Sequence, residues 1–198
     1  MIIVLSAIIG YLLGSIPFGL VITKAAGLGD IRAIGSGNIG ATNVLRTGRK
    51  DLAFATLVLD SGKGAIAVAI AYGAGWRPEI AGAAAFLGHC YPVWLGFKGG
   101  KGVATFLGTL LALWFPAGVI ACMTWLASAL ATRLSSFSAL VAAAATPLIL
   151  FSMGLRSFAL AGAFMALLIF VRHRANIERL LNGSEPRIGE GKKAAGES

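Results

Sequence analysis

The sequence has few charged residues. Charged side chains make up 13% of its 198 residues and hydrophobic ones 57%, whereas soluble domains carry about 25% charge. Acidic residues are the scarcest, with 8 Asp and Glu against 17 Lys and Arg and a formal net charge of +9. The low charge excludes an ordinary water-soluble domain. The basic excess would suggest nucleic-acid binding in a soluble protein, but it is typical of cytoplasmic loops in a membrane protein, so no nucleic-acid partner is expected.

Cysteine is also scarce. Cys90 and Cys122 both lie in apolar surroundings and do not form a C-x-x-C pair. Two cysteines are too few for a disulfide framework, and cysteines in such surroundings behave as small buried hydrophobic residues. We therefore expect no redox chemistry and no metal site.

Long apolar runs account for most of the chain. The first run, residues 2–22, has no charged segment before it and no cleavage site, so it is expected to be a retained span rather than a signal peptide. A membrane crossing needs about 20 apolar residues, or fewer in a packed helix. We predict an all-α, polytopic membrane protein with seven transmembrane helices. The predicted spans are residues 2–22, 52–74, 80–97, 103–115, 117–131, 137–153 and 158–171.

Two boundaries between these spans are weak. A five-span alternative merges residues 103–131 into one helix kinked at Pro116, and residues 137–171 into another. Both counts are odd, so both place the two termini on opposite sides of the membrane.

The basic residues predict the orientation, because positive charge in short loops stays on the cytoplasmic side. With the N-terminus outside, all basic residues face the cytoplasm except Arg77, Arg156 and the intramembrane Lys63. The C-terminus is then cytoplasmic. We predict one transmembrane domain over residues 1–188 and a disordered cytoplasmic tail over residues 189–198, which is rich in Gly, Lys and Glu.

The first motif that carries chemistry is SGNIGATNVLR, residues 36–46. Its glycines allow backbone N–H groups to approach a ligand, its small polar side chains offer donors, and its arginine offers a planar cationic fork. This combination suits a phosphate; the alternative is a polar hairpin with Ser or Asn capping a short helix. The candidate residues are Ser36, Gly37, Asn38, Gly40, Thr42, Asn43 and Arg46.

The second motif is GHCYPVWLGFKGGKGVAT, residues 88–105. Gly99, Gly100 and Gly102 flank Lys101 just before a predicted helix, whose N-terminus favours anions. The loop resembles a Walker A motif only superficially: it lacks the glycine six residues before the lysine and the Ser or Thr after it, so nucleotide hydrolysis is not expected. The alternative is that its lysines are anchors at the cytoplasmic membrane surface.

The third motif, RHRANIERLLNG, spans residues 172–183. If the preceding helix continues, His173 and Asn176 share one of its faces. The basic residues of this motif could equally be interfacial anchors. His173 and Glu178 form an H-x4-E pattern similar to the H-x4-D pair of another acyltransferase class, but a five-residue spacing puts them on different helix faces. A general-base role for this pair is therefore the weaker alternative.

Asp60 and Lys63 lie within the second predicted span. Charges in the membrane are costly and usually face a partner or a polar cavity, so we predict a structural ion pair, either within this helix or with a neighbouring helix. A direct role with substrate is the less favoured interpretation.

Together, these stretches resemble the acyl-phosphate-dependent glycerol-3-phosphate acyltransferases of bacterial membranes. The likeness covers the three motifs, the Asp60–Lys63 element and GSIPFG at residues 14–19. It implies transfer of a fatty acyl group from acyl phosphate to the sn-1 hydroxyl of glycerol 3-phosphate, giving lysophosphatidic acid and phosphate, without a cofactor. It also implies a bacterial inner-membrane protein whose site faces the cytoplasm, with the soluble enzyme that makes acyl phosphate as a candidate partner.

The resemblance also implies which residues act. The family's catalytic and phosphate-binding positions match Ser36, Arg46, Lys101, His173 and Asn176, with Asn38, Thr42 and Asn43 as additional contacts.

The expected chemistry is simple, because acyl phosphate is already activated. The site has to hold two anionic substrates, align the hydroxyl and stabilise the departing phosphate. The sequence shows no evident Ser-His-Asp set, so we hypothesise that a substrate phosphate oxygen accepts the hydroxyl proton while His173 and Asn176 orient the glycerol phosphate.

Two other functions compete with this interpretation. A membrane carrier for phosphate or an organic anion would also gather Arg, Lys and Gly near helix ends. It needs a site reachable from both faces, whereas all three motifs are predicted to be cytoplasmic. A scaffold that binds anionic lipid through its basic tail would leave the glycine-rich loops unexplained.

Overall fold

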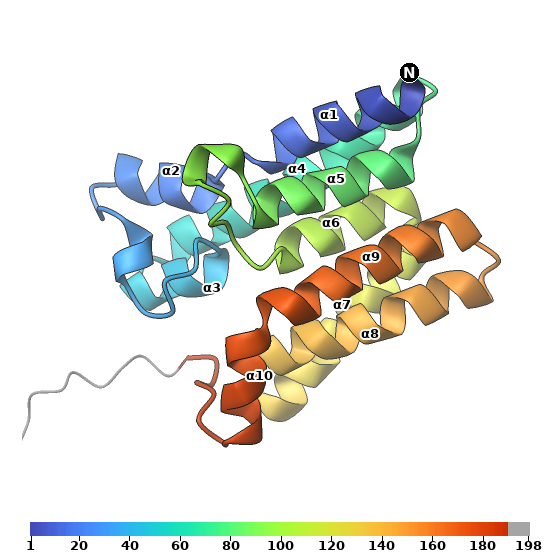
Figure 1. The fold of residues 1–198 in the computed structure, drawn as a ribbon. Helices are drawn as coiled ribbons and strands as arrows, with labels where there is room; N and C mark the ends of the chain where they lie inside the picture. Colours follow the sequence, from blue (N-terminus) through green and yellow to red (C-terminus); the bar gives the residue numbers. More distant parts are fainter. Residues whose placement is uncertain (190–198) are drawn as a thin grey trace, which may run out of the picture.

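The computed structural model describes residues 1–189, and every regular element in this part of the chain is a helix (Figure 1). The all-α prediction is confirmed. The predicted tail, apart from Gly189, lies outside the described residues. The α-helices are α1 (Ile2–Gly14), α2 (Phe18–Ala25), α3 (Ala41–Val44), α4 (Lys50–Gly73), α5 (Pro78–Cys90), α6 (Val103–Leu113), α7 (Phe115–Thr132), α8 (Ser135–Ser152), α9 (Arg156–Arg172) and α10 (Arg174–Leu181). Short 3-10 turns lie at Ile31–Ala33, Leu45–Thr47 and Val93–Leu95.

The long helices lie side by side in two groups (Figure 1). One group contains α1, α4, α5 and α6, and the other contains α7, α8 and α9. Consecutive helices from α4 to α9 pack against each other, so the chain runs back and forth between the two ends of the bundle. The segments that follow α1, α5 and α9, and those that precede α4 and α6, therefore meet at one end.

Each of the seven predicted spans contains a helix, although their number as membrane crossings stays a prediction. Four helical segments are long and apolar enough to cross a bilayer: Ile2–Ala25, α4, α7 and α8. The bent pair α9 and α10 is a fifth if it counts as one span. The shorter α6 has 11 residues and α5 has 13, so both need packing partners or a thinner membrane to cross.

The merged helices of the five-span alternative do not form. Trp114 is extended, with φ −155° and ψ 101°, and separates α6 from α7. Gly154 has a positive φ of 76° in the turn between α8 and α9. In both cases the two helices pack against each other instead of continuing.

The predicted boundaries need two corrections. The span predicted at residues 80–97 ends as a helix at Cys90, because Pro92 lacks an N–H and disfavours helical geometry at the residue before it. The run at residues 2–22 is interrupted between α1 and α2, where Pro17 has φ −90° and ψ 72°. Both breaks lie at the end of the bundle that carries the motifs.

Close packing of α1 on α5 depends on a small residue. A Cβ on Gly14 would overlap the carbonyl oxygen of Ala85. Within a membrane, small residues allow helix backbones to approach closely and gain packing energy that apolar bulk alone does not provide. The contact holds the end of α1 against α5, directly beside the second motif.

Asp60 and Lys63 form the predicted ion pair, with Lys63 Nζ 2.8 Å from Asp60 Oδ1 and both side chains buried. Lys63 Nζ also donates a hydrogen bond of 2.8 Å to the carbonyl oxygen of Ile16, in the break between α1 and α2. The Ile16 carbonyl oxygen also accepts a hydrogen bond from the backbone N–H of Phe18 at 3.1 Å. The pair therefore has a structural role: it ties α4 to the break between α1 and α2.

The outer surface of the bundle is apolar. Leu130 and Leu160 are 74% exposed and Leu148 is 71% exposed. Such surfaces are costly in water and suit a hydrocarbon environment.

Candidate active site

The three motifs meet at one end of the bundle, on the left of Figure 1. The first lies between α2 and α4, the second between α5 and α6, and the third at the bend between α9 and α10. The motifs are far apart in sequence, but they lie close together because successive helices run in alternating directions.

Asn43 organises the first motif. Its side chain is buried, and its Oδ1 accepts hydrogen bonds from the backbone N–H of Ser36 at 3.0 Å and from Ser36 Oγ at 3.3 Å. Its Nδ2 donates to the carbonyl oxygens of Ile31 and Ile34, both at 2.9 Å. All polar atoms of the side chain are engaged, so Asn43 holds Ser36 in place instead of offering a free donor to a ligand.

Arg46 lies beside Ser36. Its side chain covers Gly35, where an added Cβ would come within 2.9 Å of Arg46 Nη1. The arginine is exposed, so its guanidinium is accessible to an anion. The remaining predicted residues of the motif, Gly37, Asn38, Gly40 and Thr42, lie in the same loop or in the first turn of α3.

The glycine loop, residues 99–102, folds back on the end of α5. The N–H groups of Gly99 and Gly100 donate to the carbonyl oxygens of Cys90 and His89, each at 3.1 Å. Gly100 has to be a glycine, because a Cβ there would overlap the His89 ring. These two predicted phosphate-binding amides are therefore occupied by the loop itself. The N-terminal turn of α6, which begins after Gly102, carries the free amides that favour an anion.

Lys101 is surrounded by positive charge. The pKa of its ammonium is lowered to about 8, mainly by burial and also by the nearby guanidinium groups of Arg179, Arg172 and Arg46, while the Glu185 carboxylate opposes this shift. One of these arginines belongs to the first motif and two to the third. The site thus gathers an excess of cationic groups that a phosphate dianion would neutralise.

Asn176 joins the second and third motifs. It is buried, and its Oδ1 accepts a hydrogen bond from Lys101 Nζ. Its Nδ2 donates to Glu185 Oε1 at 2.6 Å. The amide therefore sets the direction in which the Lys101 side chain extends.

The helix does not continue through His173, which corrects the prediction for this motif. α9 and α10 are bent by 63° at this residue. The backbone N–H of His173 donates to the carbonyl oxygen of Ile169 at 2.9 Å and to that of Phe170 at 3.2 Å. The second bond has the spacing of a 3-10 helix, so the last turn of α9 is tighter than an α-helical turn. His173 and Asn176 nonetheless both lie near Lys101, across a bend that tertiary contacts hold.

The ring of His173 is buried and lies with Nδ1 2.8 Å from the carbonyl oxygen of Ile169. A carbonyl only accepts hydrogen bonds, so Nδ1 carries the proton and Nε2 is an acceptor. Burial lowers the pKa of the imidazole to about 4, and the nearby Lys101 and Arg172 contribute. The ring is neutral at physiological pH, so it suits a hydrogen-bond acceptor better than a strong base.

Glu185 is a residue that sequence reasoning missed. Its Oε1 also accepts from Ser136 Oγ at 2.7 Å, and its Oε2 accepts from Arg179 Nε at 2.7 Å. Burial would raise the pKa of this carboxyl, but the hydrogen bonds from Ser136, Asn176 and Arg179 outweigh it and the pKa is lowered. The only sequence signal was an acidic residue, one of 8, close to a basic motif.

Arg172 was also missed, since it had been assigned only as a basic residue at the membrane surface. Its Nη2 donates to the carbonyl oxygen of Gly99 at 2.7 Å, and its Nε donates to that of Gly100 at 3.0 Å. The guanidinium also lies over the Tyr91 ring, 5.2 Å from its centroid.

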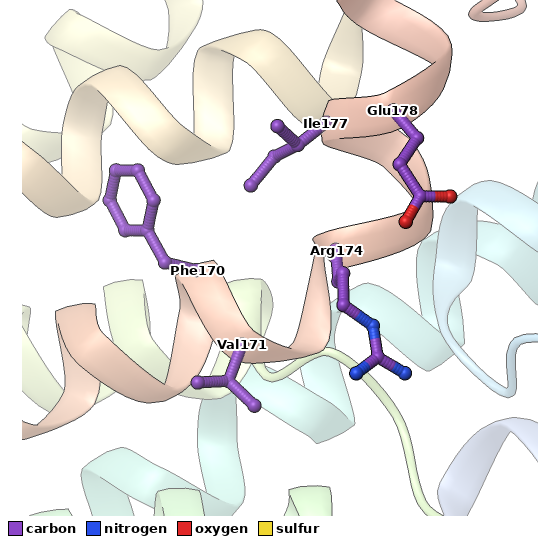
Figure 2. A pocket seen from close by; sticks show the side chains of 5 residues that line it. All are labelled: Phe170, Val171, Arg174, Ile177 and Glu178. Carbon is purple, nitrogen blue, oxygen red and sulfur yellow. The ribbon is translucent and has the colours of Figure 1, made fainter.

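Glu178 lies apart from these residues. It is exposed and helps to line a pocket of about 400 Å³ beside the α9–α10 bend (Figure 2). Within residues 1–189 it makes no contact with His173 that would support the H-x4-E pair. The other residues lining this pocket are Phe170, Val171, Arg174 and Ile177, none of which is a predicted catalytic residue.

Comparison with known proteins agrees with this arrangement. The family model for glycerol-3-phosphate acyltransferase matches residues 4–183. The chain belongs to this family. A protein of Cereibacter sphaeroides named glycerol-3-phosphate acyltransferase is 60% identical over 189 residues, which cover 94% of this chain and 90% of that protein. One of the same name from Rhodospirillum rubrum is 59% identical over 199 residues, covering 96% of this chain and 92% of its own length.

Solved structures of a relative match the fold. PlsY (YgiH), described as an integral membrane glycerol 3-phosphate acyltransferase, superimposes in its glycerol 3-phosphate form with a TM-score of 0.89 and 41% identity. The match covers 94% of this chain and 96% of that one. Its lysophosphatidic acid form gives a TM-score of 0.87 at the same identity, covering 94% and 95%. This chain is therefore an integral membrane protein that crosses the bilayer several times.

Proposed function

We propose that this protein transfers a fatty acyl group from acyl phosphate to the sn-1 hydroxyl of glycerol 3-phosphate, giving lysophosphatidic acid and phosphate for phospholipid synthesis. The observation that carries the proposal is the hydrogen bond from Lys101 to Asn176, within a group of cationic side chains drawn from all three motifs. Two phosphate-bearing substrates need such a group of charges.

In the proposed step, the glycerol hydroxyl oxygen attacks the acyl carbon of acyl phosphate. The bond between that carbon and the phosphate oxygen breaks, and the phosphate leaves with the electron pair. Lys101 and Arg46 stabilise the growing negative charge. A phosphate oxygen of a substrate takes the hydroxyl proton, since no buried carboxylate without partners lies beside His173 in the described chain.

The other side chains orient the substrates. His173 Nε2 accepts a hydrogen bond from a glycerol hydroxyl, and Ser36 Oγ, held by Asn43, donates to a phosphate oxygen. The free amides at the start of α6 contribute further donors, and Gly102 begins that turn. Alignment of the hydroxyl with the acyl carbon supplies much of the rate enhancement.

The site is proposed to face the cytoplasm of a bacterial cell, with seven crossings of the inner membrane and the N-terminus outside. The meeting of all three motifs at one end of the bundle supports this, as does the concentration of basic residues in the segments at that end. A soluble enzyme that makes acyl phosphate could then deliver it directly. The carrier alternative is disfavoured because these residues are not placed midway along the bundle.

The test is a donor comparison on the purified protein in detergent or a lipid cubic phase. Glycerol 3-phosphate is supplied with acyl phosphate, acyl-CoA or acyl carrier protein in separate reactions. We expect lysophosphatidic acid with acyl phosphate alone, with one phosphate released per product. Product from acyl-CoA or acyl carrier protein would contradict the proposed donor, and no product from any donor would contradict the proposed function.

A further inference from the structure

The glycine loop is anchored from two sides. Its N–H groups at Gly99 and Gly100 bind the end of α5, whereas the carbonyl groups of the same residues bind the Arg172 guanidinium at the end of α9. The next residue, Lys101, is held through its side chain by Asn176 of α10. The loop therefore bridges the two groups of helices.

Arg172 is suited to this task. Two of its nitrogens bind successive carbonyl oxygens at 2.7 and 3.0 Å, a geometry that a lysine ammonium does not reproduce. The guanidinium also stacks on Tyr91, which restricts its rotation. The partial negative charge of a carbonyl oxygen repels a nearby phosphate. Because Arg172 binds the carbonyl oxygens of Gly99 and Gly100, it makes the electrostatic potential of the loop more favourable to an anion.

We propose that Arg172 is a positioning residue for acyl transfer: by binding the carbonyl oxygens of Gly99 and Gly100, it sets where the Lys101 ammonium lies relative to the substrates. The proposal rests on the proposed function for its kinetic consequences. It differs from the interpretation of Arg172 as an interfacial anchor, in which any positively charged side chain at the membrane surface would fulfil the same role.

The chain offers a matched control. Arg174 lies two residues further along, at the same end of the bundle, but its side chain is exposed and extends away from Phe170 and Ile177 (Figure 2). Removal of either arginine changes the charge at this surface equally. Only the removal of Arg172 breaks the bonds to the glycine loop.

The kinetic test compares Arg172→Ala, Arg172→Lys and Arg174→Ala in the donor assay. Because a displacement of about 1 Å in a catalytic group costs about 10²-fold, we expect Arg172→Ala to lower kcat/KM by about 10²-fold. Arg172→Lys keeps the charge but not the fork, and we expect it to lose about tenfold or more. Arg174→Ala should stay within about twofold of the wild type, as expected of an exposed charge. Added guanidinium ion should restore part of the activity of Arg172→Ala but none of that of Lys101→Ala.

A second measurement does not depend on the reaction. Hydrogen–deuterium exchange of residues 96–104 should accelerate in Arg172→Ala and remain unchanged in Arg174→Ala. If the wild type makes no product, the proposed function fails, and faster exchange in Arg172→Ala alone still supports the anchoring of the loop.

Three results would overturn the proposal. These are full activity in Arg172→Lys, an equal loss of activity in Arg174→Ala and Arg172→Ala, and unchanged exchange in Arg172→Ala. If Arg172→Ala does not fold, Arg172→Lys decides the outcome by the same kinetic and exchange measurements.

Discussion

Lys101 shows how burial and neighbouring charge prepare a residue for an anionic ligand. Burial and three nearby arginines lower its pKa to about 8, so its ammonium is destabilised until negative charge arrives. Phosphate binding adds that charge and favours the protonated form. Under the proposed function, the contact is therefore strongest with the most negative bound species, which during the reaction is the departing phosphate.

The pH dependence of the reaction follows from this pKa. Lysine is charged below its pKa, so this group should leave kcat/KM constant only below about pH 7, and kcat/KM should fall as the pH rises through about 8. In Lys101→Arg the falling limb should disappear, because arginine stays charged over this range. Initial rates from about pH 6.5 to 9.5 test this. A falling limb that persists unchanged in Lys101→Arg would assign it to another group.

Substitution of a cationic side chain at the site should lower kcat/KM more than its deprotonation does. Lys101→Ala and Arg46→Ala should each lower kcat/KM by about 10²-fold or more, because each loses a charge-assisted contact with phosphate that strengthens in the transition state. Thr47→Ala, which changes a residue just beyond the first motif, is the control and should be nearly silent. Near-normal rates in folded Lys101→Ala would refute the assigned phosphate site.

Among the elements, α10 matters most to the site. It is turned by 63° from α9, and the segment that follows it returns to the start of α8. Glu185 in that segment binds Ser136 of α8 and both Asn176 and Arg179 of α10. The carboxylate thus fixes the bend from outside the helix and, through Asn176, fixes Lys101.

Two glutamates near the third motif provide a matched comparison. Glu185→Gln loses a charge-assisted network, and a hydrogen bond to a charged group contributes about 1.5–3 kcal/mol. We therefore expect kcat/KM to fall by about tenfold or more and the thermal unfolding temperature to drop. Glu178→Gln should be nearly silent in both measurements, because this side chain is exposed on the opposite face of α10. A strong effect of Glu178→Gln would restore the H-x4-E pair as a catalytic hypothesis.

At the scale of the whole molecule, the alternation of helix direction is what makes the site one-sided. The ends of α1, α5 and α9 and the starts of α4 and α6 lie together, while the turns between α4 and α5 and between α8 and α9 lie at the other end (Figure 1). Under the proposed function, substrate phosphates therefore reach the site from one aqueous phase, while the acyl chain remains in the bilayer.

Cysteine labelling tests this topology. After replacement of Cys90 and Cys122, single cysteines at Lys50, Lys98 and Arg174 should react only when the cytoplasmic side is accessible. Cysteines at Arg77 and Arg156 should react from outside in sealed cells. Outside labelling of Lys98→Cys or Arg174→Cys would contradict a cytoplasmic site.

Local structure follows from the sequence alone: hydrophobic runs predict each long helix, Pro and Gly mark most breaks, and three motifs contain the candidate residues. The i, i+3 spacing of Asp60 and Lys63 sufficed to predict their ion pair, because residues three apart on a helix are neighbours. These inferences need only the periodicity of the backbone and the conformational preferences of single residues.

How the motifs support one another depends on contacts that exist only in the folded bundle. Glu185 binds Ser136, and Arg172 binds the glycine loop across a separation of 73 positions in the chain. The bend at His173 places these residues within reach of one another. No local preference specifies such contacts, because each depends on which helix ends the folded bundle places side by side. A buried carboxylate or guanidinium must find partners wherever the fold supplies them, and those partners turn basic residues at a membrane surface into a site.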